Sequence, residues 1–377
     1  MGKEHYVEKV LTGIEGLDDI TYGGLPKYRA TLVSGYAGCG KTVLAMQFIL
    51  NGIIQHDEPG VFISMEETET DLRNNMASFG YDIGKLENEN KIYIENVKIG
   101  HTDLFGSGNF DMSALLIRIE LAIKSVNAKR IVIDTPEMIF NDIQDENIFR
   151  REFLRMINWL KERGLTAVFT AGRKENQLTK TGIEEFVTDC VILLKHIKVD
   201  NVYTRRLHIL KYRGSKHGTN EYPFLIDHKG ISLLPITIPY EKDIISNEIL
   251  STGIEGLDEQ INKKGIYKGS TLLISGTSGT GKTTLAVSFC MSALKNNLRC
   301  LFFAFEETNS QLQRNMFSVG FDFKKYEKTG ALKIAAERPT LFGLETHLVK
   351  LHKYIEEFNP DVVILDPITN LIQVGTI

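Results

Sequence analysis

The stretch Ala30–Thr42 reads ATLVSGYAGCGKT and decides the fold. An apolar run comes first, a segment of the pattern GxxxxGK[ST] follows, and apolar residues at helical spacing continue in VLAMQFILNGII. This order predicts a strand, a tight loop and a helix. In such a loop, backbone N–H groups surround phosphate oxygens, the lysine adds positive charge and the final hydroxyl binds Mg²⁺. The stretch therefore predicts a site for ATP with Mg²⁺.

The sequence also repeats itself at a long interval. TGIEGLD occurs at Thr12–Asp18 and again 240 residues later, at Thr252–Asp258. Three further motifs recur in the same order: GYAGCGKT as GTSGTGKT, MEET as FEET and NMASFGYD as NMFSVGFD. This interval indicates duplication of a whole domain rather than a solenoid of short repeats. We expect the two loops to bind ATP through Gly38, Cys39, Gly40, Lys41, Thr42 and Val43, and through Gly279, Thr280, Gly281, Lys282, Thr283 and Thr284.

Short apolar runs alternate with helical stretches along the first copy. GVFISM, KRIVID, TAVFTA and CVILLK are bounded by polar residues or glycine, and FDMSALLIRIELAIKSV separates two of them. This alternation predicts an α/β fold of the RecA-like, P-loop type, with a doubly wound and largely parallel sheet. We place the first domain at 1–235, a linker with interrupting prolines at 236–245 and the second domain at 246–377. Since 11 residues follow Asp366, we expect the second copy to be incomplete at its C-terminus.

Composition and charge limit the classes of partner that we expect. The 377 residues carry a net charge of −4 with both signs interspersed, which disfavours nucleic acid as a partner. The four cysteines lack metal-ligand spacing and are expected to be reduced thiols. The sequence has neither an apolar leader segment nor an apolar run long enough to cross a bilayer. We therefore expect no membrane contact and a cytoplasmic location.

Two kinds of acid recur beside the loops. Asp134 in RIVIDT and Asp366 in VVILDP end apolar runs, where an acid can complete a Mg²⁺ site with Thr42 and Thr283; a helix cap or turn is the alternative.

Two pairs of adjacent acids form the second kind. Glu66 and Glu67 follow the apolar run GVFISM, and Glu306 and Glu307 recur at the matching place in the second copy. Adjacent side chains on an extended chain point to opposite sides, so one acid can accept a proton from the attacking water while its neighbour has a positioning role. A solvated turn is the alternative.

A basic segment lies late in the first copy. LKYRGSKHG contains Lys211, Arg213, Lys216 and His217. It is either a solvated basic hairpin, or Lys211 and Arg213 act on the γ-phosphate of a neighbouring subunit, because phosphoryl transfer gains from added positive charge there. The residues alone leave both interpretations open.

Together these motifs resemble the KaiC family of RecA-like ATPases, which includes the circadian-clock ATPase. EEFVTD at 184–189, KYRGSKHG at 211–218 and EYPF at 221–224 add to the resemblance. It implies a homo-oligomeric double ring, usually hexameric, with ATP between subunits and protein signalling partners. It also implies catalytic roles for Glu66 and Glu306 and a place near the nucleotide base for Ser78, with Ser318 as its repeat. The residues that would reach a neighbour's ATP are Lys211, Tyr212, Arg213, Ser215 and His217.

Four functions remain open at this point. The leading hypothesis is a KaiC-like ring that hydrolyses ATP at subunit interfaces and whose nucleotide state controls signalling or clock-type partners. A Ser/Thr autokinase is the second, at least in a full-length form, with Glu306 deprotonating a hydroxyl. The third is a RecA- or RadA-like ATPase that acts on DNA, and the fourth is a scaffold that binds ATP without turnover.

Overall fold

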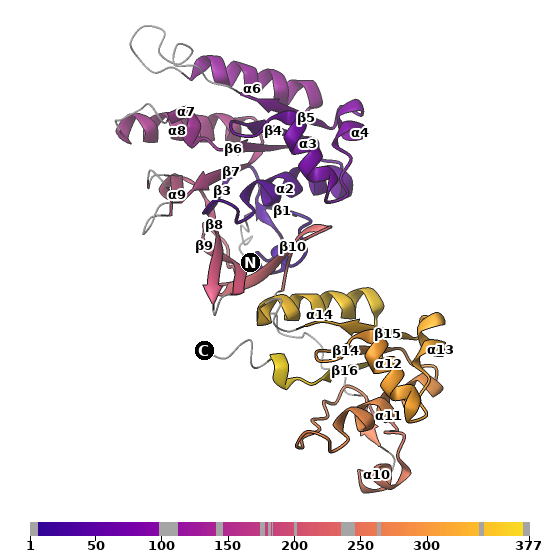
Figure 1. Cartoon of the computed structure of the whole chain (residues 1–377). Helices are drawn as coiled ribbons and strands as arrows, with labels where there is room; N and C mark the ends of the chain where they lie inside the picture. Colours follow the sequence, from indigo (N-terminus) through magenta and orange to yellow (C-terminus); the bar gives the residue numbers. More distant parts are fainter. Residues whose placement is uncertain are drawn as a thin grey trace, which may run out of the picture. The chain divides into compact units, whose positions relative to one another are not determined.

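The computed structural model describes residues 7–97, 112–140, 146–173, 178–179, 182, 184–199, 202–234, 246–261, 265–338 and 343–371. The predicted linker at 236–245 lies outside these residues. The chain divides into two compact units, Met1–Lys198 with Thr204–Ile238 and Val199–Tyr203 with Pro239–Ile377. Figure 1 draws both units.

Among the described residues, the first unit is built on one nine-stranded sheet in the order β11-β10-β9-β8-β3-β7-β6-β4-β5. The strands from β8 to β5 in this order pair in parallel, and β10 pairs antiparallel with β9 and β11. The largely parallel α/β fold predicted from the sequence is confirmed. The bounds are β3 (Ala30–Gly35), β4 (Gly60–Ser64), β5 (Ile92–Asn96), β6 (Arg130–Asp134), β7 (Thr166–Gly172), β8 (Cys190–Val199), β9 (Val202–Tyr212), β10 (Glu221–Asp227) and β11 (Gly230–Leu233).

Helices cover both faces of this sheet (Figure 1). Val33 and Phe62 pack on the side of α2 (Lys41–His56), α3 (Glu69–Ala77) and α4 (Ile83–Asn88). Their sequence neighbours Leu32 and Ile63 pack on the side of α6 (Ser113–Val126) and α8 (Glu146–Glu162), because successive residues of a strand face opposite ways. The short elements are β1 (Lys9–Val10), α1 (Leu17–Ile20), β2 (Leu25–Pro26), α7 (Glu137–Phe140) and α9 (Glu184–Val187).

The second unit repeats the first part of this arrangement. Its described sheet is parallel, in the order β15-β14-β16. The bounds are β12 (Ile249–Leu250), α10 (Glu255–Gln260), β13 (Ile266–Tyr267), α11 (Lys282–Lys295), β14 (Cys300–Ala304), α12 (Asn309–Ser318), α13 (Phe323–Lys328), β15 (Leu332–Ala336), α14 (Leu344–Phe358) and β16 (Val362–Asp366). Apart from β3, these elements match β1 through β6 of the first unit, so the duplication extends to the fold.

One segment of the second unit departs from the repeat. Residues 271–276, TLLISG, match β3 in sequence but form no strand, and Leu273 is 75% exposed. In the first unit, β3 lies between β7 and β8, which both follow β6 along the chain. In the described part of the second unit, no counterpart of these two strands is present to accept the backbone hydrogen bonds.

Within the described ranges, no helix combines the length and the apolar character that crossing a bilayer requires.

Candidate active site

The first glycine loop joins β3 to α2. Gly38 and Gly40 have φ of 73° and 101°, in the left-handed region that favours glycine. At Gly40 a Cβ would also lie 2.7 Å from Cδ1 of Ile226, whereas at Gly38 it would meet nothing within 4 Å. Lys41 Nζ donates to the carbonyl of Tyr36 at 3.1 Å and so lies along the loop. This geometry fits phosphate, because the loop leaves open space beside Gly38 at the N-terminus of a 16-residue helix.

Of the other loop residues predicted to contact ATP, Cys39 is buried and Val43 is half-buried.

A buried carboxylate lies beside the loop. Asp134, at the end of β6, is 5% exposed. Its Oδ2 accepts a hydrogen bond from Thr42 Oγ1 at 2.8 Å, and its Oδ1 accepts one from Thr170. Burial raises the pKa of Asp134, and the hydrogen bonds from Thr170 and Thr42 oppose this rise. An Asp carboxylate and a Thr hydroxyl in contact supply the oxygen ligands that Mg²⁺ prefers, and the cation would offset the cost of burying the charge.

The two adjacent glutamates point to different partners. Glu66 is exposed, and its Oε1 accepts from Thr135 Oγ1 at 3.4 Å. Glu67 is half-buried, and its Oε2 accepts from Asn75 Nδ2 at 2.9 Å. Burial, and next the nearby charge of Asp134, raise the pKa of Glu67. One carboxylate is therefore accessible, and the other is held by a neighbouring side chain.

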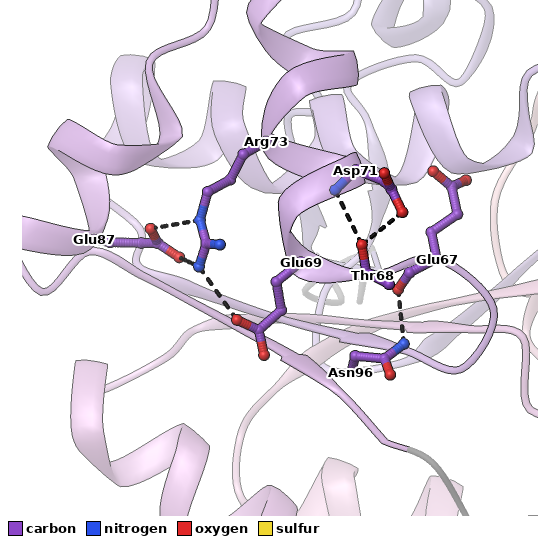
Figure 2. A network of polar contacts seen from close by, with 7 residues as sticks. All are labelled: Glu67, Thr68, Glu69, Asp71, Arg73, Glu87 and Asn96. Carbon is purple, nitrogen blue, oxygen red and sulfur yellow. Dashed lines mark hydrogen bonds and ion pairs between the residues drawn. The ribbon is translucent and has the colours of Figure 1, made fainter.

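The main chain of this turn is held as well (Figure 2). Ser64 Oγ donates to the carbonyl of Glu67 at 2.6 Å and accepts from its N–H at 3.1 Å. Asn96 Nδ2 donates to the same carbonyl at 2.7 Å. Four residues of this site were not predicted from the sequence: Ser64, Asn96, Asn75 and Thr170. Only Asn75 carried a signal, since it opens the repeated motif NMASFGYD.

The second loop has a backbone similar to that of the first, but its threonine and acid are not joined in the same way. Gly279 and Gly281 again have positive φ, and Thr280 Oγ1 donates to the carbonyl of Thr277 at 2.8 Å. Lys282 Nζ donates to the same carbonyl at 2.8 Å. Thr284 is exposed, and among the described residues no hydrogen bond joins Thr283 to Asp366, which is half-buried.

The second glutamate pair repeats only part of the first. Glu307 Oε1 accepts from Asn315 Nδ2 at 2.8 Å, as Glu67 does from Asn75. Glu306 Oε1 accepts from Asn370 Nδ2 at 3.3 Å.

Ser78 and Ser318 are exposed at matching places, at the C-terminal ends of α3 and α12. Each hydroxyl donates to a carbonyl one turn earlier at 2.6 Å, that of Asn75 and that of Asn315. The repeat thus preserves the local structure of both serines.

The basic segment lies at the opposite end of β3 from the first loop. Arg213 N–H donates to the carbonyl of Asp189, whose own N–H donates to Ala30 at the start of β3. The loop begins at Gly35, at the other end of the strand, which is roughly 16 Å away at 3.3 Å per residue. Lys211 Nζ donates to the carbonyl of Glu185 at 2.8 Å. These cations therefore do not lie at the glycine loop of the same copy.

The other residues of the basic segment make contacts within the same chain. Tyr212 is buried and its hydroxyl donates to the carbonyl of Gly24 at 2.9 Å. His217 stacks on Tyr212 with ring centroids 6.4 Å apart, and Ser215 Oγ donates to the carbonyl of Lys216 at 2.9 Å.

The family model described as "ATPase: KaiC" matches residues 10–238 and 250–376. The chain belongs to the KaiC family of ATPases. It is 43% identical over 369 residues to the circadian clock protein KaiC2 of Synechocystis sp., and the aligned region covers 98% of this chain and 65% of the relative. It is 40% identical over 367 residues to the circadian clock oscillator protein KaiC of Synechococcus elongatus, and here the aligned region covers 97% of this chain and 70% of the relative. The chain thus spans about two thirds of the length of these relatives.

Both copies of this KaiC-family chain lie within the matched segments, so the family accounts for both loops. The first copy has the more complete site among the described residues. It joins the loop threonine to the buried acid and anchors the turn that carries Glu66 and Glu67, and neither feature has a counterpart among the described residues of the second copy.

Proposed function

We propose that this chain hydrolyses ATP with Mg²⁺ at sites shared by neighbouring copies in a homo-oligomeric, hexameric ring. The observation that carries the proposal is the contact between Thr42 Oγ1 and the buried carboxylate of Asp134 beside the glycine loop. A hydroxyl and a buried acid in this position are the protein ligands that P-loop ATPases use for Mg²⁺. The KaiC family of the chain supports the same activity.

Each residue of the first copy has a distinct role in this proposal. Lys41 and the loop N–H groups bind the phosphates, and Thr42 and Asp134 hold Mg²⁺, which supplies charge neutralisation when bound. Glu66 accepts a proton from the attacking water, because it is the exposed member of the pair. Glu67, held by Asn75, positions the turn that carries Glu66. Glu306 and Glu307, with Lys282, Thr283 and Asp366, would act in the same way in the second copy.

A neighbouring subunit completes the site. Lys211 and Arg213 lie at the other end of β3 from their own loop, so contact with ATP would require a second copy of the chain. We propose that they stabilise the γ-phosphate across the interface, where added cations speed phosphoryl transfer. Tyr212, Ser215 and His217 belong to the same segment and would approach the same nucleotide.

The test is ATP hydrolysis by the purified chain at rising protein concentration. Specific activity should climb with concentration and should collapse in both Glu66→Gln and Arg213→Ala. Lys216→Ala is the matched control, since this exposed lysine lies in the same segment and is expected to leave activity unchanged. Flat activity that Arg213→Ala leaves intact would contradict the shared site, and activity that survives Glu66→Gln would contradict the role of Glu66.

The relatives are named as circadian clock proteins, and on this ground we propose that the nucleotide state of the chain controls its binding to protein partners in the cytoplasm. Incubation with ATP labelled at the γ-phosphate separates this from the autokinase alternative. Release of labelled phosphate without label on the protein supports hydrolysis as the activity of this chain. Label on a Ser or Thr side chain would assign it an autokinase activity.

A further inference from the structure

The turn that carries the first glutamate pair belongs to no helix or strand. It runs from Met65 to Thr68, between β4 and α3, and is called the glutamate turn below. Three hydrogen bonds from two side chains hold the main chain of Glu67, two of them from Ser64 and one from Asn96. Figure 2 shows Asn96 reaching the Glu67 carbonyl from the neighbouring strand. Ser64 and Asn96 are also direct partners across β4 and β5.

The second copy has the same strand framework around its turn. Ala304 and Ala336 are the direct partners across β14 and β15, at the positions that Ser64 and Asn96 occupy in the first copy. Phe305 N–H donates to the carbonyl of Asp366 at 2.9 Å, as Met65 does to that of Asp134 at 2.7 Å.

The Asn–Glu side-chain contact is present in both copies as well. The three hydrogen bonds to the main chain of Glu67 depend on two side chains that differ between the copies. Alanine has neither a donor nor an acceptor beyond its backbone, so the second turn lacks all three hydrogen bonds.

We propose that Ser64 and Asn96 are positioning residues that hold the glutamate turn for hydrolysis in the first copy, and that their replacement by alanine makes the second copy the slower site. The proposal deepens the proposed ATP hydrolysis and rests on it. A carboxylate that must accept a proton from a water molecule works only within a narrow range of positions, and a displacement of 1 Å costs up to about a hundredfold in rate. Anchoring the backbone beside Glu66 limits this displacement without contact to ATP.

Kinetics of the full chain test the role of each hydrogen bond. Asn96→Ala should lower kcat roughly tenfold and leave KM for ATP within about twofold, because the loop that binds phosphate is untouched. Asn96→Asp should behave like Asn96→Ala, since the carboxylate keeps the shape but loses the N–H donor. Ser64→Thr should retain activity because it keeps the hydroxyl.

Arg73→Gln serves as the control, because it removes an ion pair near the turn but none of the hydrogen bonds to the main chain of Glu67. Arg73 and Glu87 form an ion pair beside the turn, and Gln313 and Glu327 replace it in the second copy. A full-rate Asn96→Ala variant, or one that loses activity only in proportion to thermal stability, would overturn the proposal.

Hydrogen exchange tests the anchoring without relying on turnover. The peptide that spans Met65–Thr68 should exchange severalfold faster in Ser64→Ala and Asn96→Ala than in the parent chain. The reciprocal change Ala304→Ser with Ala336→Asn should slow exchange of the peptide that spans Phe305–Thr308. Unchanged exchange in both experiments would overturn the proposal even if the chain hydrolyses no ATP. Absence of turnover together with the expected exchange pattern would instead overturn the proposed function alone.

Discussion

In the first copy, the strand that ends in Asp134 begins with a buried arginine, and in the second copy the matching strand begins with Val362. Arg130 is 1% exposed, pairs with Glu58 at 2.6 Å and donates to the carbonyl of Phe48 at 2.8 Å. The matching position to Glu58 in the second copy is Leu298, which packs against the apolar core.

The same fold therefore accommodates an ion pair or an apolar contact at one place. Theory and experiment agree that a protein with a buried ion pair and one with an apolar replacement can have similar stability. A buried charge left without its partner, in contrast, is strongly destabilising. At this site the strand framework is shared, and both members of the ion pair differ together between the copies.

Gly52→Ala should have the largest effect of the changes that test this idea. A Cβ at Gly52 would lie 2.3 Å from Arg130 Nε, so the guanidinium must leave Glu58. Leaving a buried charge without its partner costs about 3–5 kcal/mol, and we expect a loss at the lower end of this range in the free energy of unfolding, because the Glu58 side chain is 30% exposed. Urea unfolding followed by fluorescence measures it, because the chain has one tryptophan, Trp159, and it lies in the first unit.

The second copy supplies the control. It has Ala293 where the first copy has Gly52, beside Val362. The triple change Gly52→Ala, Arg130→Val and Glu58→Leu should recover most of the lost stability. A triple variant as unstable as Gly52→Ala would show that the side chains of this site were not exchanged as a set.

The loop lysines should have the next largest effect. We expect Lys41→Ala to lower kcat/KM for ATP hydrolysis about a hundredfold, which corresponds to ~2.7 kcal/mol, because it removes charge at the phosphates of the more complete site. Lys282→Ala should cost less than about tenfold. Steady-state kinetics at saturating Mg²⁺ measures both, and equal losses would contradict the inequality of the two copies.

Tyr81→Phe should have a smaller effect. Tyr81 donates to Asn51 Oδ1 at 2.9 Å and accepts from Gln47 Nε2 at 3.2 Å, whereas the second copy has Phe321 at this position. Loss of one half-buried hydrogen-bonding hydroxyl should lower the free energy of unfolding by ~1 kcal/mol. Trp159 fluorescence in urea again gives the value, and a variant as stable as the parent would mean that water satisfies the network equally well.

Arg73→Gln should have the smallest effect. The ion pair of Arg73 with Glu87 has N–O distance 2.9 Å, but the arginine side chain is 35% exposed, and solvent screens such pairs. We expect a loss of at most ~0.5 kcal/mol, since exposed pairs contribute little and Gln313 shows that an amide is accommodated there. A loss above ~1.5 kcal/mol in the same urea experiment would contradict this.

Much of the site was predictable because it is local in sequence. The glycine loop, Lys41 and Thr42 lie within one short segment whose residue types follow from phosphate and Mg²⁺ chemistry. Asp134 and the glutamate pairs were recognised because each ends an apolar run and recurs in the second copy. The duplication and the parallel sheet followed from the repeat and from alternating apolar segments.

The remaining features depended on which strands are neighbours. Thr170 contacts Asp134 only because β7 pairs with β6, and Asn96 reaches Glu67 only because β5 pairs with β4. The position of Lys211 and Arg213, at the other end of β3 from the loop, likewise follows from the sheet. No spacing in the sequence encodes these pairs.

By itself, the sequence determined the duplicated P-loop fold, the family and the acids expected around Mg²⁺, because those signals lie within single segments of the chain. Only the tertiary structure decided that Ser64 and Asn96 hold one glutamate turn and that residues 271–276 lack strand partners. The physical reason is that a hydrogen bond forms between groups that the fold brings within about 3 Å, whatever their separation along the chain.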